Sequence, residues 1–352
     1  MVTSCNFLDV IPSGKATEAD LFKTHVQADN FAASLYYYMP NRWYFQSSLE
    51  MCGGGDMVSS FYGSVYYFKW KSLVFNSLET ASNTYVAMWS TTCPKADGAV
   101  SYNVWGGIRN AYLLLENIDK VPDATEEEKK MIEGQLYFFR AWWHFELINW
   151  FGGLPYIDIA FEGNEDLQIP RLTYQECADK AAADFRKAAD LLPINWDNTD
   201  AGKATFNKND LRINKVMALA YLGKCYLWAS SPLMEHGAEV GGANTYNYNK
   251  EYAQKAADAF GELLALVESG QTQYALAEFN YTDIYNHTRA ADAANSYSDN
   301  FYTRKQNWKQ PGTVEAIFRG PSPDFNGSNW NTTKVFGPKV EGLVAHDNVI
   351  HQ

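Results

Sequence analysis

The segment Glu133–Pro155, EGQLYFFRAWWHFELINWFGGLP, indicates the fold of this chain most directly. Its apolar residues recur every three to four positions, the spacing that places side chains on one face of a helix. The residues on this face are Phe138, Ala141, Phe145 and Ile148. The sequence Phe151-Gly152-Gly153 follows, and Pro155 lies just beyond it. Glycine and proline in this order are typical of a helix C-terminus, so we expect a long helix that ends at Phe151.

Other stretches have the same helical periodicity. The hydroxyl of Thr125 can cap the first amides of the helix just described, and Glu128 completes a capping box there. Further helices are predicted at Glu18–Tyr38, Ser101–Lys120, Tyr174–Leu192, Asp210–Ser230 and Lys250–Val267. Alternation typical of strands is scarce outside Ser64–Phe68 and Thr313–Phe318. The sequence therefore predicts a mainly α fold.

Two of the predicted helices match parts of the tetratricopeptide repeat pattern. Leu222-Gly223-x2-Tyr226 fits the first half of that pattern, and Ala256-x3-Phe260 fits part of the second. The second half recurs at Ala181, Phe185, Ala188 and Pro193. Long loops separate the halves, at 151–172 and 230–249, so these would be decorated repeats. Ordinary helical hairpins with alanines at their contacts explain the same pattern equally well.

The composition excludes several classes of protein. The chain has 352 residues, 29 basic and 41 acidic, and 46% are hydrophobic, which is too apolar for a disordered chain. A net charge of −12 without a basic block argues against binding to a nucleic-acid backbone. No run of about 18 apolar residues is present, so the sequence predicts no membrane-spanning helix.

The aromatic residues, 15% of the chain, divide between helices and loops. Two regions break the helical pattern, 41–99 and 295–331, and both mix aromatic residues with Asn, Ser and Gly. Loops longer than about 15 residues in a compact protein are usually functional or disordered, and the aromatic content argues against disorder. We expect both regions to be functional.

Motifs for catalysis and metal binding are absent from the sequence. It contains no GxSxG, HExxH, Walker loop or dinucleotide fingerprint, and its six histidines never fall at metal-ligand spacing. His144 lies on a hydrophobic helix, where a core role is commoner than a role as a base. A glycosidase pair of carboxylates distant in sequence stays open, although no residue points to one. The pattern favours a binding protein without a cofactor or metal.

Cys5 is the cysteine with a possible function. It follows Val2-Thr3-Ser4 near the start of the sequence, an acceptable version of the box that precedes a lipid-bearing cysteine in bacterial lipoproteins. On these four residues alone, an incidental surface thiol is the commoner explanation. The other four cysteines contain no CxxC pair and are interpreted as small buried residues.

Three segments together resemble the SusD/RagB family of outer-membrane nutrient-binding lipoproteins of the Bacteroidetes. Cys5-Asn-Phe-Leu-Asp-Val-Ile-Pro12 resembles the start of the mature family members, and Trp105-x2-Ile-Arg-Asn-Ala111 resembles an early helix. The most specific segment is Arg140–Pro155, a helix that ends in Phe-Gly-Gly-x-Pro. The resemblance extends over nearly the whole chain.

The resemblance implies a single domain over 1–352, a SusD-like α-α superhelix of four decorated tetratricopeptide-like units. The family normally extends past the position of Gln352, so a C-terminal part is expected to be missing. Residues 1–17 would form a lipidated tether at Cys5. The implied partners are a SusC-like TonB-dependent transporter in the outer membrane and an oligomeric nutrient, and no covalent chemistry or nucleic acid is involved.

The loop aromatics are the candidate ligand residues, because an aromatic ring covers the apolar face of a sugar. They are Trp70, Trp89, Tyr297, Tyr302, Trp308 and Trp330, with Asp56, Asn83, Arg304 and Asn329 as polar partners. The alternative for each loop tryptophan is a small core beneath the loop. The helix tryptophans are expected to pack between helices: Trp105, Trp142, Trp143, Trp150 and Trp228.

Three functions remain open at this level. The first is a lipid-anchored glycan binder at the cell surface that delivers its ligand to the transporter. The second has the same fold and location with peptide as cargo, which the aromatic and asparagine-rich loops favour less. The third is a tetratricopeptide-type interaction scaffold, which predicts no lipid on Cys5.

Overall fold

The computed structural model describes residues 22–38, 104–159, 161, 168–206, 209, 211–234, 247–275 and 317–318. Within these ranges the chain forms helices and their connections, with no β-strand, which confirms the mainly α prediction. The elements are α1 (His25–Ser34), η3 (Leu35–Tyr38), α4 (Val104–Leu115), η6 (Ile118–Lys120), α5 (Glu126–Phe151), α6 (Tyr174–Leu191), η7 (Trp196–Asn198), α7 (Asp200–Lys203), α8 (Lys215–Ala229) and α9 (Lys250–Glu268).

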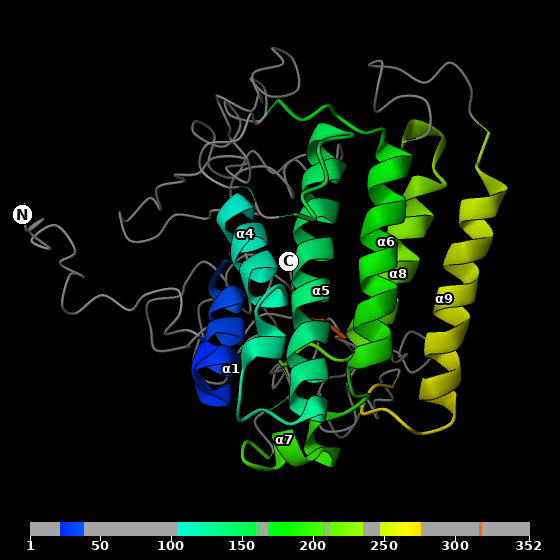
Figure 1. The fold of residues 1–352 in the computed structure, drawn as a ribbon. Helices are drawn as coiled ribbons and strands as arrows, with labels where there is room; N and C mark the ends of the chain where they lie inside the picture. Colours follow the sequence, from blue (N-terminus) through cyan, green and yellow to red (C-terminus); the bar gives the residue numbers. More distant parts are fainter. Residues whose placement is uncertain are drawn as a thin grey trace, which may run out of the picture.

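The long helices form a row. Helix α5 packs against α6, α6 against α8, and α8 against α9, while α4 and α1 lie on the other side of α5. Figure 1 shows α5, α6, α8 and α9 standing side by side, with short α7 at one end of the row. Consecutive helices alternate in direction, so the end of α5, the start of α6, the end of α8 and the start of α9 lie at the opposite end of the row.

Contacts between α8 and α9 explain the repeat pattern. A Cβ added to Gly223 on α8 would come within 2.5 Å of the Phe260 ring on α9, so only glycine permits this close approach. Tyr226 and Tyr252 lie against each other one turn further along, with ring centroids 5.9 Å apart. The fold is therefore tetratricopeptide-like, with α5–α6 and α8–α9 as successive helical pairs.

Local signals set the ends of α5. The capping box of Thr125 and Glu128 is present, and three glutamates in the first turn complement the positive end of the helix dipole. Gly152 ends the helix at a φ of 72°, and its N–H donates to the carbonyl of Ile148. Glycine adopts this conformation at no steric cost.

The second glycine of the Phe-Gly-Gly motif has a different role. A Cβ at Gly153 would lie 1.9 Å from the carbonyl oxygen of Leu172, because the chain entering α6 passes directly against it. Arg171 donates to the carbonyls of Gly153, at 2.6 Å, and Phe151, at 2.9 Å. The motif therefore joins the end of α5 to the start of α6, where Thr173 and Glu176 form a second capping box.

Two predicted boundaries differ from the structure. Helix α8 begins at Lys215 and not at Asp210, because Asn214 is its N-cap and accepts a hydrogen bond from the Met217 amide. The preceding Ile213 accepts from the Trp196 indole at 2.8 Å, which holds this part of the chain outside the helix. The predicted helix Ser101–Lys120 ends earlier, since α4 stops at Leu115 and a 3-10 turn follows.

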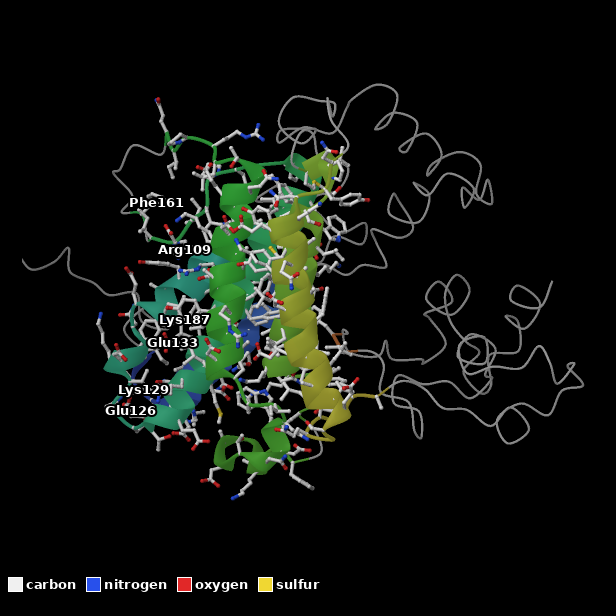
Figure 2. The ribbon with its side chains drawn as sticks, turned by 90° about the vertical axis from the view of Figure 1, so that its right-hand side faces the viewer. Arg109, Glu126, Lys129, Glu133, Phe161 and Lys187 are labelled. Carbon is white, nitrogen blue, oxygen red and sulfur yellow. The ribbon has the colours of Figure 1, made fainter. Side chains whose placement is uncertain are left out.

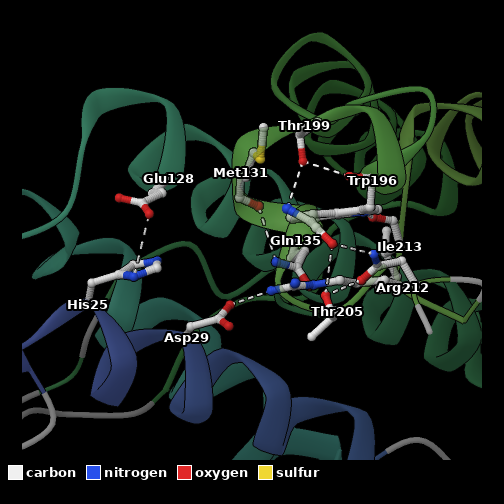
Figure 3. Close-up of polar contacts among 12 residues, drawn as sticks. His25, Asp29, Glu128, Met131, Gln135, Trp196, Thr199, Thr205, Arg212 and Ile213 are labelled. Carbon is white, nitrogen blue, oxygen red and sulfur yellow. Dashed lines mark hydrogen bonds and ion pairs between the residues drawn. The ribbon is translucent and has the colours of Figure 1, made fainter. Parts of the chain in front are cut away.

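Helix α1 is attached to the row by polar contacts from residues distant in sequence (Figure 3). Arg212 donates to Asp29 at 2.5 Å, and its guanidinium lies 4.0 Å from the centroid of the Trp196 ring. His25 Nδ1 lies 3.7 Å from the carboxylate of Glu128 at the start of α5. The helix was predicted to start at Glu18, which lies outside the described residues. Within the described residues α1 begins at His25, and Thr24 is its N-cap.

Candidate functional site

The residues predicted to bind ligand lie outside the described part of the chain. They are Trp70, Trp89, Tyr297, Tyr302, Trp308, Trp330, Asp56, Asn83, Arg304 and Asn329. The lipidation candidate Cys5 and the strand-like segment Ser64–Phe68 also lie outside it. What the structure describes is the helical framework and two residues of the 295–331 region, Ile317 and Phe318.

Phe318 lies against rings of α5 and α8. The centroid of its ring is 5.3 Å from Tyr221 and 5.4 Å from Phe138, with Tyr221 edge-on at 86°. Trp142 is 5.8 Å away. We call Phe138, Trp142, Phe145, Tyr221, Lys224, Trp228 and Phe318 the aromatic face. The region 313–318 was predicted as a strand, but its two described residues form a bend.

The far end of the aromatic face reaches solvent. Trp228 is 38% exposed, and its indole packs edge-on against Phe145 at 6.0 Å. The ammonium of Lys224 lies 5.4 to 5.9 Å from the rings of Tyr221, Trp228 and Phe145. A half-exposed indole beside an ammonium group can cover a sugar ring and donate to its hydroxyls.

Trp228 was predicted to pack between helices, and the structure corrects this in part. Trp228 follows buried Tyr221 by two helical turns, so both side chains are expected on the same face of α8. Trp228 is more exposed because it lies in the last turn of the helix. The sequence signal for this exposure is Ser230, which caps the end of the helix two residues after Trp228. Trp142 and Trp143 are buried as predicted, and Trp105 is partly buried. The Trp150 side chain lies outside the description.

A cluster of buried polar groups lies between α5 and α6. Arg140 makes two hydrogen bonds of 2.7 Å to the carboxylate of Asp184, and Tyr156 donates to the same carboxylate at 2.7 Å. Burial opposes the charge of the guanidinium, but the hydrogen bonds and charge of Asp184 outweigh it and raise the pKa of Arg140. The paired charges compensate each other in the interior, which is the role of a structural ion pair.

His144 lies beside this cluster and is held neutral. The Ile157 amide donates to Nε2 at 3.0 Å, so Nδ1 carries the proton and donates to the Arg140 carbonyl at 2.7 Å. Burial lowers the pKa of His144 from 6.5 to about 3. Both ring nitrogens are occupied and the ring is fully buried, which confirms the prediction of a core histidine.

Helices α5 and α6 also carry a charged surface, separate from the aromatic face. Figure 2 shows Glu126, Lys129, Glu133 and Lys187 at this surface. Lys187 pairs with Glu133 at 3.2 Å and Lys129 with Glu126 at 3.5 Å. Exposed pairs of alternating sign contribute at most about 1 kcal/mol each and are typical of a solvated face. The charged surface therefore offers no candidate for recognition.

Metal-binding clusters and membrane-spanning helices are both absent from the described residues. No group of three or more His, Cys, Asp or Glu side chains there could hold a metal ion. Nor does any described helix have the length and apolarity needed to cross a membrane.

Comparison with known families identifies the sequence that forms this framework. Residues 59–227 match a family model, SusD-like, described as starch-binding and associating with the outer membrane. The match includes α4, α5 with the Phe-Gly-Gly motif, α6, α7 and most of α8. Residues 59–227 belong to the SusD-like family. A search of curated proteins found no significant match.

Three similar solved structures cover part of this chain. The protein BT4246 is 19% identical with a TM-score of 0.54, over 74% of this chain and 43% of that one. A SusD-like protein from Bacteroides fragilis NCTC 9343 is 18% identical with a TM-score of 0.47, over 73% and 40%. A laminarin-binding SusD-like protein is 20% identical with a TM-score of 0.44, over 69% and 44%. The chain thus spans less than half the length of these structures.

Proposed function

We propose that this SusD-like chain is a cell-surface lipoprotein that binds a glycan and delivers it to a SusC-like TonB-dependent transporter. The observation that supports this most strongly is the match of residues 59–227 to a family described as starch-binding and associated with the outer membrane. The protein acts by capture and release. No covalent step is part of the function.

The ligand site lies in the two loop-rich regions, 41–99 and 295–331. Their aromatic residues form platforms for sugar rings: Trp70, Trp89, Tyr297, Tyr302, Trp308 and Trp330. Asp56, Asn83, Arg304 and Asn329 hydrogen-bond the hydroxyls. This division of labour follows sugar chemistry, because each ring has an apolar C–H face and a rim of donors and acceptors.

The described framework supports a binding function over catalysis. His144, which lies on the hydrophobic helix α5, is buried, neutral and hydrogen-bonded at both nitrogens, so it is unsuited to act as a base. The buried carboxylate of Asp184 is fully engaged with Arg140 and Tyr156. These groups hold α5 and α6 together.

Binding to polysaccharides tests the proposal. The 352-residue chain is titrated calorimetrically with laminarin, amylose and other soluble glycans, and with a panel of peptides of similar size. We expect one glycan to bind with a Kd in about the micromolar range, which corresponds to about −8 kcal/mol. Trp89→Ala and Trp308→Ala should each weaken binding about tenfold or more, because each removes a stacking platform.

Tyr248→Ala is the matched control, because Tyr248 is an exposed aromatic residue, 69% exposed, outside both loop regions. It should bind like the unaltered chain. Unchanged affinity in both tryptophan variants would remove these loops as the platform. Binding to peptides without binding to any glycan would replace the glycan by peptide cargo.

A further inference from the structure

One aromatic side chain of the helical framework reaches solvent while it belongs to a continuous cluster of rings. Trp228, in the last turn of α8, is 38% exposed. Phe206 and Tyr248 are further exposed aromatic residues of the described chain, but Trp228 is the one that lies on the aromatic face. It extends a ring surface whose nearest members, Phe145 and Tyr221, are buried.

The indole of Trp228 is held from behind. Phe145 of α5 is fully buried and packs edge-on against it, with ring centroids 6.0 Å apart and ring planes at 71°. The end of α8 is held as well, because the Ser230 amide donates to the Tyr226 carbonyl at 2.9 Å and the Ser230 carbonyl accepts from the Asn249 amide at 2.9 Å. An aromatic surface that is fixed before its ligand arrives loses little side-chain freedom on binding.

Lys224 places a hydrogen-bond donor beside this indole. It lies one helical turn before Trp228, on the same side of α8. Its ammonium is 5.7 Å from the centroid of the Trp228 ring and 5.4 Å from that of Tyr221, where cation–π attraction keeps it near the rings. A lysine ammonium has three N–H donors, so it can donate to a ligand hydroxyl in addition to the contacts that it already makes.

We propose that Trp228, with Phe145 behind it and Lys224 beside it, binds one sugar ring of a neutral glycan. Trp228 supplies the stacking surface, and Lys224 donates to a hydroxyl of the same ring. The site is formed by α5 and α8 and is additional to the ligand residues proposed in the loop regions. The choice of a glycan as its ligand rests on the proposed function.

The chemistry of the exposed surface selects this ligand. A hexose has an apolar C–H face bordered by hydroxyl groups, and an indole next to an ammonium presents the matching pair of features. An acyl chain or an aliphatic side chain would cover the ammonium of Lys224 without offering it an acceptor, which is costly. The net charge of −12 disfavours an acidic glycan, so the ligand is a neutral one.

Fluorine-19 NMR of the 352-residue chain labelled with 5-fluorotryptophan tests this site. The chain has 11 tryptophans, and the Trp228 signal is the one missing from Trp228→Phe, which keeps an aromatic ring against Phe145. Maltoheptaose and laminarihexaose are titrated separately. We expect at least one of them to shift the Trp228 signal saturably, with a Kd of about 1 mM, because a single stacked sugar ring buries little surface.

Lys224→Met tests the donor, because methionine keeps most of the aliphatic stem and loses the ammonium. It should raise the Kd at the Trp228 signal about fivefold, while Lys224→Arg, which keeps a charged donor, should change it less than about twofold. Leu227→Ala is the matched control: Leu227 is 49% exposed and lies about 100° further round the helix, so its loss should leave the Kd unchanged. An equal weakening in Leu227→Ala, or none in Lys224→Met, would overturn the proposed contacts.

A Trp89→Ala, Trp308→Ala double variant separates this site from the loop platforms of the proposed function. The Trp228 shift should persist in it with the same Kd. No Trp228 shift with either oligosaccharide, or a shift that disappears in the double variant, would overturn the site, and shifts of other tryptophan signals would then still support the proposed function. A Trp228 shift that persists when no other tryptophan responds would support this site and count against the loop platforms.

Discussion

Among single residues, His144 links the stability of the fold to pH. Its pKa is lowered from 6.5 to about 3 by burial, so the folded protein keeps it neutral in conditions where the unfolded chain gains a proton. The stabilising effect is complete above pH 6.5 and is lost as the pH falls towards 3. We expect His144 to contribute a loss of about 2 kcal/mol in unfolding free energy between pH 6.5 and pH 5, at about 1.4 kcal/mol per pH unit.

Urea unfolding at these two pH values measures this loss. His144→Gln is the comparison, because glutamine can hydrogen-bond and does not titrate. The variant is less stable at pH 6.5, and its stability should change less with pH than that of the unaltered chain. An identical pH dependence in both proteins would show that His144 is not the group responsible.

Gly153 and Gly261 give opposite expectations for the same substitution. Gly153→Ala should destabilise the protein by about 3 kcal/mol, because the new methyl group would overlap the Leu172 backbone and force the chain entering α6 away. Gly261→Ala should stabilise it by about 0.5 to 1 kcal/mol, since a Cβ there meets nothing within 4 Å and alanine favours the helix. Thermal unfolding of the two variants checks both signs. A neutral Gly153→Ala would contradict the close approach at the Phe-Gly-Gly motif.

Among the helices, α5 and α6 begin in the same way. Thr125 accepts from the Glu128 amide at 3.2 Å, and Thr173 accepts from the Glu176 amide at 3.2 Å. Thr173→Ala should lower the unfolding free energy by about 1 kcal/mol, because an amide of the first turn loses its partner. Thr173→Ser keeps the hydroxyl and should cost less than half as much. The two values come from urea unfolding at one pH, and equal losses would show that the hydroxyl is not the cause.

Helix boundaries could be predicted where their causes are local. The start of α5 at the Thr125 capping box and its end at Phe151 follow from residues within four positions of each boundary. The start of α8 has a local signal in the Asn214 N-cap, which the periodic pattern overlooked. The contacts that hold the preceding Ile213 outside the helix come from more distant residues, the Trp196 indole and the Tyr36 hydroxyl at 2.9 Å. A periodic pattern contains no information about such partners.

For the molecule as a whole, the sequence predicted the framework better than the site. The repeat pattern selected Gly223 and Phe260, and the structure brings these two residues together between α8 and α9. The place of Phe318 was missed, since its ring partners lie about 100 to 180 residues away and its neighbours alternate as in a strand. The proposed ligand residues of 41–99 and 295–331 stay predictions.

Attachment to the outer membrane is the last expectation at this scale. The SusD-like family is described as associating with the outer membrane. Cys5 provides the attachment in our proposal, through a lipid on its sulfur. In the native host, Cys5→Ala should shift the protein from the outer-membrane fraction to the soluble fraction, because one or more acyl chains supply the membrane affinity. Cys52→Ala is the control and should leave the protein in the membrane. Mass spectrometry of the N-terminal peptide should find the lipid on Cys5, and an unmodified Cys5 in a membrane-bound protein would assign the attachment to a partner instead.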